Sequence, residues 1–143
     1  MPRLDPYESL GFLCSLTLRA FTRNLEARLE GSGVSEAQFR ALAHLVALGP
    51  LAQVELAKRL FTTPATVARL VDRMERDGWV TREPHPEDGR RNLLVLTEEA
   101  RRSWEEVGQV GRDLINAAHR GVHPTEIEIT KRVLAQVRAN LGE

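Results

Sequence analysis

The sequence of 143 residues predicts a mainly helical fold with one small β-hairpin. Two observations support this prediction. Over most of the chain, apolar residues recur three or four positions apart, which is the spacing of amphipathic helices. The period changes at WVTRE and NLLVL, residues 79–83 and 92–96, two short β-prone runs on either side of a loop rich in proline, glycine and charge. The length fits one domain with helical extensions.

Composition limits the class of protein. Hydrophobic residues make up 42% of the chain and charged residues 28%, a globular balance that argues against disorder. Lys+Arg and Asp+Glu both number 20, so a general basic attraction to nucleic acid is not expected. The one cysteine excludes an internal disulfide framework and a cysteine-rich zinc site. We find no bilayer-spanning apolar run and no signal-peptide core, and therefore expect a cytoplasmic protein without a membrane partner.

The first helix is predicted from residue 10 to about residue 29, before the sequence EGSG. Its apolar surface is wider than that of a lone surface helix, so it is expected to bury two faces. The stripe consists of Leu10, Leu13, Cys14, Leu18, Phe21, Leu25 and Leu29, with Phe12 and Leu16 beside it. A second helix follows to about residue 48, opened by a capping box of Ser35 and Gln38 and ended by Gly49 and Pro50.

Two further helices precede the hairpin. A short one is expected over about 52–60, with a weak start, because leucine and alanine at its N-cap position cannot accept a backbone N–H. The next has Thr63 as N-cap and Pro64 at its first position, where the missing N–H of proline costs nothing. It is predicted to end at Gly78, a natural left-handed stop.

After the hairpin, Thr97 is the expected N-cap of a long helix that runs to about residue 120. The sequence GVHP breaks it, and Thr125 with Glu128 predicts a capping box that opens a last helix to about residue 141. The order is therefore four helices, a hairpin and two helices. Its middle part has the order of a winged helix-turn-helix, and the outer helices are more apolar than a monomer's surface would be.

The helix at 64–77 has one face for the core and one for a partner. A stripe at i, i+3, i+4 and i+7 is expected to be buried, namely Val67, Leu70, Val71 and Met74. The opposite face presents Ala65, Arg69, Asp72 and Arg76, with Thr62, Thr66 and Arg73 alongside. An ordinary solvated face is one interpretation. DNA is favoured because a hairpin with Arg90 and Arg91 at its tip follows at once, which suits a helix in the major groove and a wing beside it.

The stretch TVARLVDRMERDGWVTREPHPEDGRRNLLVLTEEAR, residues 66–101, resembles the MarR family of bacterial transcription regulators. The resemblance rests on three motifs: RLVDRMERDGWV at the end of a helix, DGRR in the wing, and LT before a long helix. The order of the helices extends the resemblance to nearly the whole chain. It implies a winged helix-turn-helix core (35–96) flanked by N-terminal (1–34) and C-terminal (97–143) dimerisation helices. Homodimers of this kind bind pseudo-palindromic double-stranded DNA.

By position match, the resemblance implies a set of DNA-binding residues. Those of the helix face the major groove, Arg90 is the wing residue for the minor groove, and Asp88 holds it. Asp72 is expected to pair with an arginine of the wing or the helix. The full set is Thr62, Thr63, Pro64, Ala65, Thr66, Arg69, Arg73, Asp88, Arg90 and Arg91.

The resemblance also implies a repressor released by a small-molecule effector, or alternatively by oxidation at Cys14. The leucines around Cys14 favour instead a buried, inert thiol. His119 and His123 do not suggest a metal site, because Gly121 and Pro124 break the helix that would align them. No catalytic motif and no cofactor site is recognised, so we do not expect an enzyme. A winged helix that only docks another protein is the alternative, and Arg69 and Arg90 argue against it.

Overall fold

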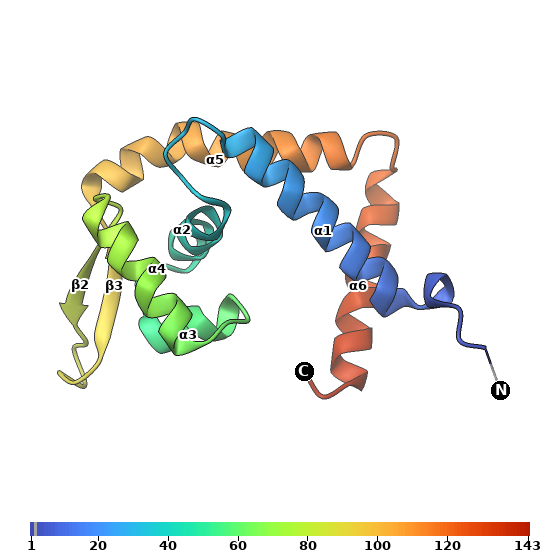
Figure 1. Ribbon diagram of the computed structural model, residues 1–143, viewed down its shortest axis with the longest axis horizontal. Coiled ribbons are helices and arrows are strands. Elements are labelled where there is room, and N and C mark those ends of the chain that lie inside the picture. Colours follow the sequence, from blue (N-terminus) through green and yellow to red (C-terminus); the bar gives the residue numbers. More distant parts are fainter. Residues whose placement is uncertain (2) are drawn as a thin grey trace. The chain divides into compact units, whose positions relative to one another are not determined.

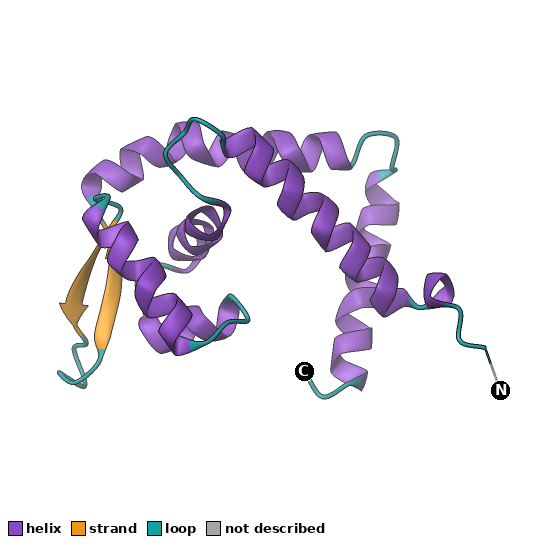
Figure 2. Cartoon of the chain, viewed as in Figure 1, coloured by secondary structure: helices purple, strands orange, loops and turns teal. Residues whose placement is uncertain are grey.

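The computed structural model describes residues 1 and 3–143 and confirms a mainly helical fold with a small antiparallel sheet (Figure 1, Figure 2). Its elements in chain order are η1 (Pro6–Glu8), α1 (Leu10–Leu29), α2 (Glu36–Leu48), β1 (Leu51–Ala52), α3 (Gln53–Arg59), α4 (Pro64–Arg76), β2 (Val80–Pro84), β3 (Asn92–Leu96), α5 (Glu98–Ala118) and α6 (Pro124–Asn140). The chain forms two compact units, Met1–Gly111 and Arg112–Glu143, and α5 runs through the boundary between them. No helix in the described part of the chain is long and apolar enough to cross a bilayer.

The core of the first unit is built from α2, α3, α4 and the sheet. The predicted α4 stripe is confirmed, since Val67, Leu70, Val71 and Met74 are each at most 4% exposed. Leucines of the neighbouring elements are buried with it, namely Leu42 and Leu45 of α2, Leu56 of α3 and Leu94 of β3. Burial of one whole face of α4 leaves its opposite face in solvent.

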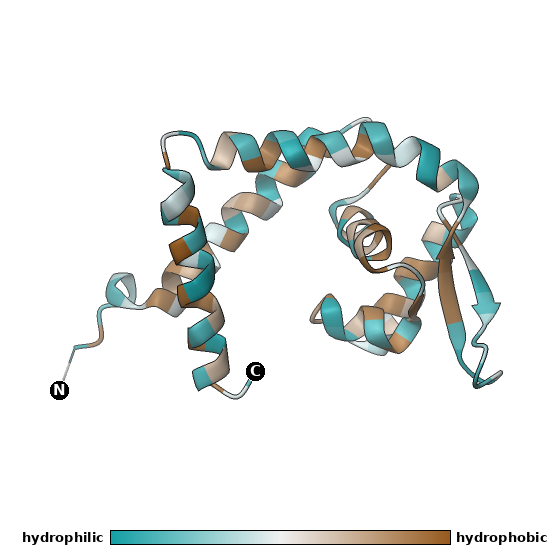
Figure 3. Ribbon diagram, turned by 180° about the vertical axis from the view of Figure 1, so that it is seen from behind, coloured by the Kyte–Doolittle hydropathy of each residue, from teal (hydrophilic) through white to brown (hydrophobic). Residues whose placement is uncertain are grey.

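The sheet has three antiparallel strands in the order β1-β3-β2. In the hairpin, Val80 pairs with Leu96 and Pro84 with Asn92, so the expected wing is confirmed. The sequence does not predict strand β1. It consists of two residues, Leu51 opposite Leu94 and Ala52 opposite Leu93, which is too short to produce an alternating pattern. In Figure 3 β3 is largely hydrophobic, whereas β2 and the loop are largely hydrophilic.

Side-chain caps fix the ends of the elements that hold the wing. The capping box of Ser35 and Gln38 is confirmed, as is the absence of a side-chain cap on α3. Thr97 Oγ1 accepts a hydrogen bond from the backbone N–H of Ala100 at 3.0 Å and donates one to the carbonyl of Gly78 at 2.6 Å. The start of α5 is therefore bonded to the start of the hairpin.

The expected start of α6 is wrong. Its N-cap is His123, two residues before the expected Thr125, because Pro124 occupies the first helical position; the capping box is formed by His123 and Glu126. Glu128 instead forms an ion pair with Lys131 at 2.7 Å. Cys14, expected to be buried, is exposed on α1 in the single chain. The apolar stripe of α1 predicts a core face along its whole length, yet only the C-terminal end of that stripe is buried.

Candidate nucleic-acid interface

The exposed face of α4 presents the residues that the sequence singled out. Thr63, Pro64, Ala65, Thr66, Arg69 and Arg73 are exposed, and Thr62 is half-buried in the turn before the helix. Thr63 Oγ1 accepts the backbone N–H of Thr66 at 3.2 Å, and the two hydroxyl oxygens lie 2.9 Å apart in a second hydrogen bond. The first turn of α4 is thus capped by these hydrogen bonds, and it presents small and hydroxylic side chains.

The loop between β2 and β3 is shaped by Asp88. Its Oδ1 accepts the backbone N–H of Arg90 at 3.0 Å, and its carbonyl accepts the N–H of Arg91 at 3.0 Å. The carbonyl of Arg91 in turn accepts the N–H of His85 at 3.0 Å, which closes the loop. Asp88 therefore holds the backbone of Arg90, while the side chains of Arg90 and Arg91 are both exposed.

Arg82 of β2 joins the wing to α4. Its guanidinium lies 2.6 Å from a carboxylate oxygen of Asp72 and 3.4 Å from one of Glu75. The expected pairing of Asp72 with a wing or helix arginine is confirmed, and the partner is Arg82, which is not among the predicted site residues. Strand alternation could have indicated Arg82 from the sequence. Arg82 lies two residues after buried Val80 and therefore faces the same side of the sheet.

The ion pairs divide the arginines of this region into two groups. Arg82 is held by Asp72 and Glu75, and Arg76 lies 3.3 Å from Asp77, whose other oxygen accepts a hydrogen bond from buried Gln38. Within residues 1 and 3–143, no carboxylate lies within ion-pair distance of the other group, which is Arg69, Arg73, Arg90 and Arg91. These four exposed guanidinium groups have donors available for an external anion.

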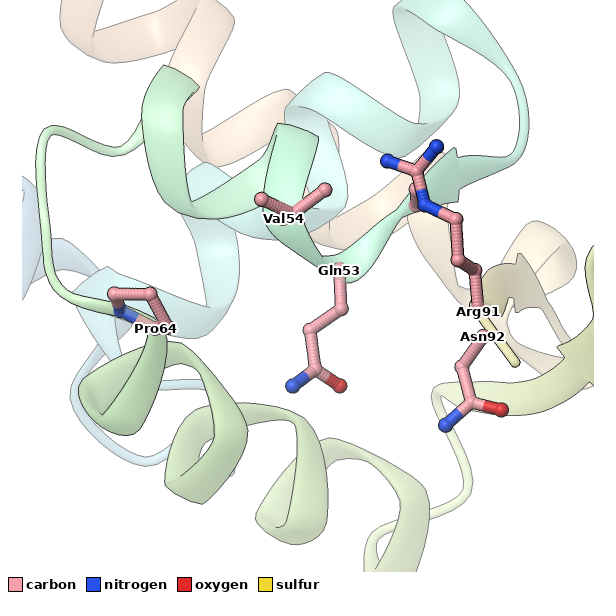
Figure 4. Close-up of a pocket in the computed structure, with 6 residues that line it drawn as sticks. Gln53, Val54, Pro64, Arg91 and Asn92 are labelled. Carbon is pink, nitrogen blue, oxygen red and sulfur yellow. The ribbon is translucent and has the colours of Figure 1, made fainter. Parts of the chain in front are cut away.

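A hollow of about 250 Å³, with a mixed polar and apolar lining, lies between the start of α4 and the wing. It is lined by Ala52, Gln53, Val54, Pro64, Arg91 and Asn92, so it brings the predicted residues Pro64 and Arg91 to one concave surface (Figure 4). Sequence reasoning missed Gln53 and Asn92. Both are uncharged, and neither belongs to a motif, so only the fold reveals that they share a site with Pro64.

The remaining candidate residues lie outside this surface. Cys14 is exposed on α1, away from α4 and the wing. His123 has a structural role, because its Nδ1 accepts the backbone N–H of Thr125 at 3.2 Å and so caps α6. Three or more metal-binding side chains do not gather anywhere in residues 1 and 3–143.

Comparison with known proteins gives consistent matches. Residues 32–91 match the model of the MarR family. The chain is 30% identical to the multiple antibiotic resistance protein MarR of Escherichia coli (strain K12) over 129 residues, 90% of each protein. It is 28% identical to the HTH-type transcriptional repressor IacR of Pseudomonas putida, over 85% of this chain and 72% of IacR. The match to the HTH-type transcriptional regulator YwoH of Bacillus subtilis, at 36% identity, spans 62% of this chain and 64% of YwoH.

A solved structure shares the fold over nearly the whole chain. It is a mutant form of MarR from Escherichia coli in complex with operator DNA, with a TM-score of 0.79 and 29% sequence identity. The match covers 90% of this chain and 92% of that one. The fold therefore extends beyond the winged core to the flanking helices.

Proposed function

Since the chain belongs to the MarR family and is a DNA-binding transcription regulator, we propose that α4 and the wing are the parts that contact the duplex. One observation supports this most directly. Four exposed arginines without an ion-pair partner in the described chain lie on α4 and in the wing loop, whereas the arginines between them, Arg76 and Arg82, are held by carboxylates. These four exposed arginines are therefore on the surface that would face a duplex bound by α4 and the wing.

The proposed contacts follow from the shape of the two elements. Helix α4 enters the major groove with its small, hydroxylic first turn, Thr62 to Thr66, close to the groove floor. Arg69, about one turn further along, reaches a base edge, where guanine O6 and N7 accept a bidentate arginine. Arg73 lies one turn further still and contacts phosphate. Arg90 extends from the wing into the neighbouring minor groove, and Asp88 fixes the loop that presents it.

We propose that the protein acts as a homodimer in the cytoplasm. Each unit exposes large apolar side chains, which in a stable protein usually mark an interface. On α1, Leu10, Leu13, Leu16 and Leu18 are 38–64% exposed, and in the second unit Ile115, Val122, Ile129, Val133 and Leu141 are 40–77% exposed. A two-fold dimer would place two recognition helices about 34–36 Å apart on a pseudo-palindromic site.

Release of DNA by an unidentified small-molecule effector is the proposed form of regulation, with repression as the outcome; IacR is a repressor by name. An effector that binds one dimer state about tenfold more tightly shifts the balance by about 1.4 kcal/mol. Oxidation at the exposed Cys14 is the second arm to test. Phenolic compounds and hydrogen peroxide are added separately to the DNA complex. Cys14→Ser should abolish the release of DNA by peroxide but not its release by a phenolic ligand, so the variant distinguishes the two.

The test of the interface uses DNA sites selected from random duplexes. Arg69→Ala is expected to weaken the preferred site by about 1–3 kcal/mol and to reduce discrimination between sites. Arg90→Ala is expected to weaken all sites and to lower the slope of log K against log salt by about one unit, since one cation that displaces counterions from the duplex is lost. Gel-shift titrations at several salt concentrations measure both effects.

Arg138→Ala is the matched control, because Arg138 is an exposed arginine of α6, outside the interface. It should bind as the unmodified protein does. Equal binding by all three variants would refute the assignment of α4 and the wing.

A further inference from the structure

The hollow between α4 and the wing holds two carboxamides that the proposed contacts do not use. Gln53 extends from the first turn of α3 into the space above α4, and Asn92 reaches the same space from the first residue of β3 (Figure 4). Within the described residues, neither carboxamide hydrogen-bonds another protein group. Each offers two N–H donors and one acceptor.

The position of the hollow determines what can occupy it. If α4 lies in the major groove and the wing in the adjacent minor groove, one sugar–phosphate strand separates the two grooves and must pass between these elements. The hollow lies between them, with Pro64 of α4 on one side and Arg91 of the wing on the other. Any duplex bound in this manner brings a backbone strand over Gln53 and Asn92.

The lining also matches the chemistry of that strand. Ala52, Val54 and Pro64 supply apolar surface, which suits a deoxyribose ring. The carboxamides and the Arg91 guanidinium supply N–H donors, which suit phosphate oxygens. In Figure 4 Arg91 and Asn92 point to different sides, as neighbours in a strand do, so they bound different parts of the hollow.

We propose that Gln53 and Asn92 form a neutral phosphate clamp on the DNA strand between the two grooves. The clamp rests on the proposed DNA-binding mode and adds two positioning residues to it. Because the donors are uncharged, they fix the register of the protein on the duplex without releasing counterions. They differ in this from Arg90, whose loss changes the salt slope.

The experiment combines protein variants with modified DNA. Gln53→Ala and Asn92→Ala should each weaken binding about tenfold, equally on all sites, because a hydrogen bond to a charged group is lost, and should leave the salt slope unchanged. Gln53→Glu, which keeps the shape but places a carboxylate against the phosphate, should bind more weakly than Gln53→Ala. Gln136→Ala is the matched control, since the Gln136 carboxamide bonds Asn140 at 2.9 Å within α6. Circular dichroism confirms that each variant is folded.

Neutral methylphosphonate groups then replace single phosphates of the selected site. One position in each half-site should weaken the unmodified protein about tenfold and barely affect Gln53→Ala, because both changes remove the same contact. The clamp would be overturned if Gln53→Ala and the methylphosphonate reduced affinity independently of each other at every phosphate. It would also be overturned if the loss of affinity in the variants depended on the base pair, which would indicate base readout. If the unmodified protein binds no duplex at all, the proposed function falls together with the clamp.

Discussion

Phe61 has the least favourable backbone among the described residues. It is the one non-glycine residue there with a positive φ, 51°, and its side chain is 93% exposed in the turn between α3 and α4. A left-handed conformation costs a residue with a Cβ about 1–2 kcal/mol. The turn needs this conformation because the chain must reverse within a few residues to bring Thr63 to the cap of α4.

Replacing Phe61 with glycine should therefore stabilise the fold. The expected gain in the free energy of unfolding is about 0.5–1 kcal/mol, since relief of the strain is partly offset by the greater entropy of glycine in the unfolded chain. Urea denaturation at fixed protein concentration measures it. Phe61→Ala is the control, because alanine removes the ring and keeps the strain; an equal gain from alanine would assign the effect to the exposed ring.

Gly111 permits the close approach of Phe39 to α5. A Cβ at position 111 would lie 2.6 Å from Phe39 Cζ, and the Phe39 ring is itself packed against Trp104, with centroids 5.3 Å apart. Gly111→Ala should lower the free energy of unfolding by about 1 kcal/mol, because overpacking outweighs the gain in helix propensity.

Gly11→Ala is the comparison, since the nearest atom to a Cβ there is Ser9 Oγ at 3.7 Å, an ordinary contact. That change should be neutral or stabilising in the same thermal or urea unfolding experiment. If both Gly111→Ala and Gly11→Ala left the free energy of unfolding unchanged or raised it, the ring of Phe39 would have to move away without cost.

At the scale of single residues, sequence reasoning succeeds where a local rule acts alone. The caps at Ser35, Thr63 and Thr97 follow from short-range hydrogen bonding, and the buried stripe of α4 follows from its period. The strain at Phe61 and the pairing of Arg82 depend on tertiary contacts, so no local pattern could specify them. The site residues of α4 and the wing remain predictions, placed on the exposed surface as expected.

Among the elements, the wing and α4 are coupled through Arg82. Its side chain is 23% exposed and bridges two carboxylates of the helix, so it fixes the direction in which the hairpin leaves the core. In the proposed binding mode, the same bridge would neutralise two acids on the side of α4 that faces the DNA.

Arg82→Ala should lower DNA affinity while changing stability little. The ion pairs are partly exposed, so the expected loss in the free energy of unfolding is about 0.5–1 kcal/mol. DNA affinity should fall further than this, because Asp72 and Glu75 become unpaired beside the DNA and the wing loses its anchor. Fluorescence anisotropy measures the affinity, with Arg138→Ala as the charge-matched control. If the free energy of DNA binding falls no more than the free energy of unfolding, the wing does not depend on the Arg82 ion pairs for DNA binding.

Element boundaries are the least predictable feature of the sequence. Strand β1 is too short to leave a pattern, and α6 begins at Pro124 with a histidine cap, a residue type that capping rules seldom favour. Long periodic helices, in contrast, are placed within a few residues, because an apolar stripe over five turns is a strong signal.

For the whole molecule, the proposed homodimer would cover the exposed leucines of α1. Leu13→Glu should convert the dimer to a monomer, since a charge would be buried at the interface, and should weaken DNA binding because both half-sites can no longer be held together. Sedimentation at micromolar concentration reports the mass. Leu48→Glu is the control, because Leu48 is 50% exposed at the end of α2, compared with 42% for Leu13. A monomeric unmodified protein would refute the dimer.

The balance of 20 basic and 20 acidic residues has a consequence for how such a regulator finds its target. With Arg76 and Arg82 neutralised internally, long-range attraction to bulk DNA is weak, and few copies should be sequestered on the vast excess of unrelated genomic sequence. Occupancy of the correct locus should then depend on the guanidinium groups of α4 and the wing that are exposed and unpaired in the described chain.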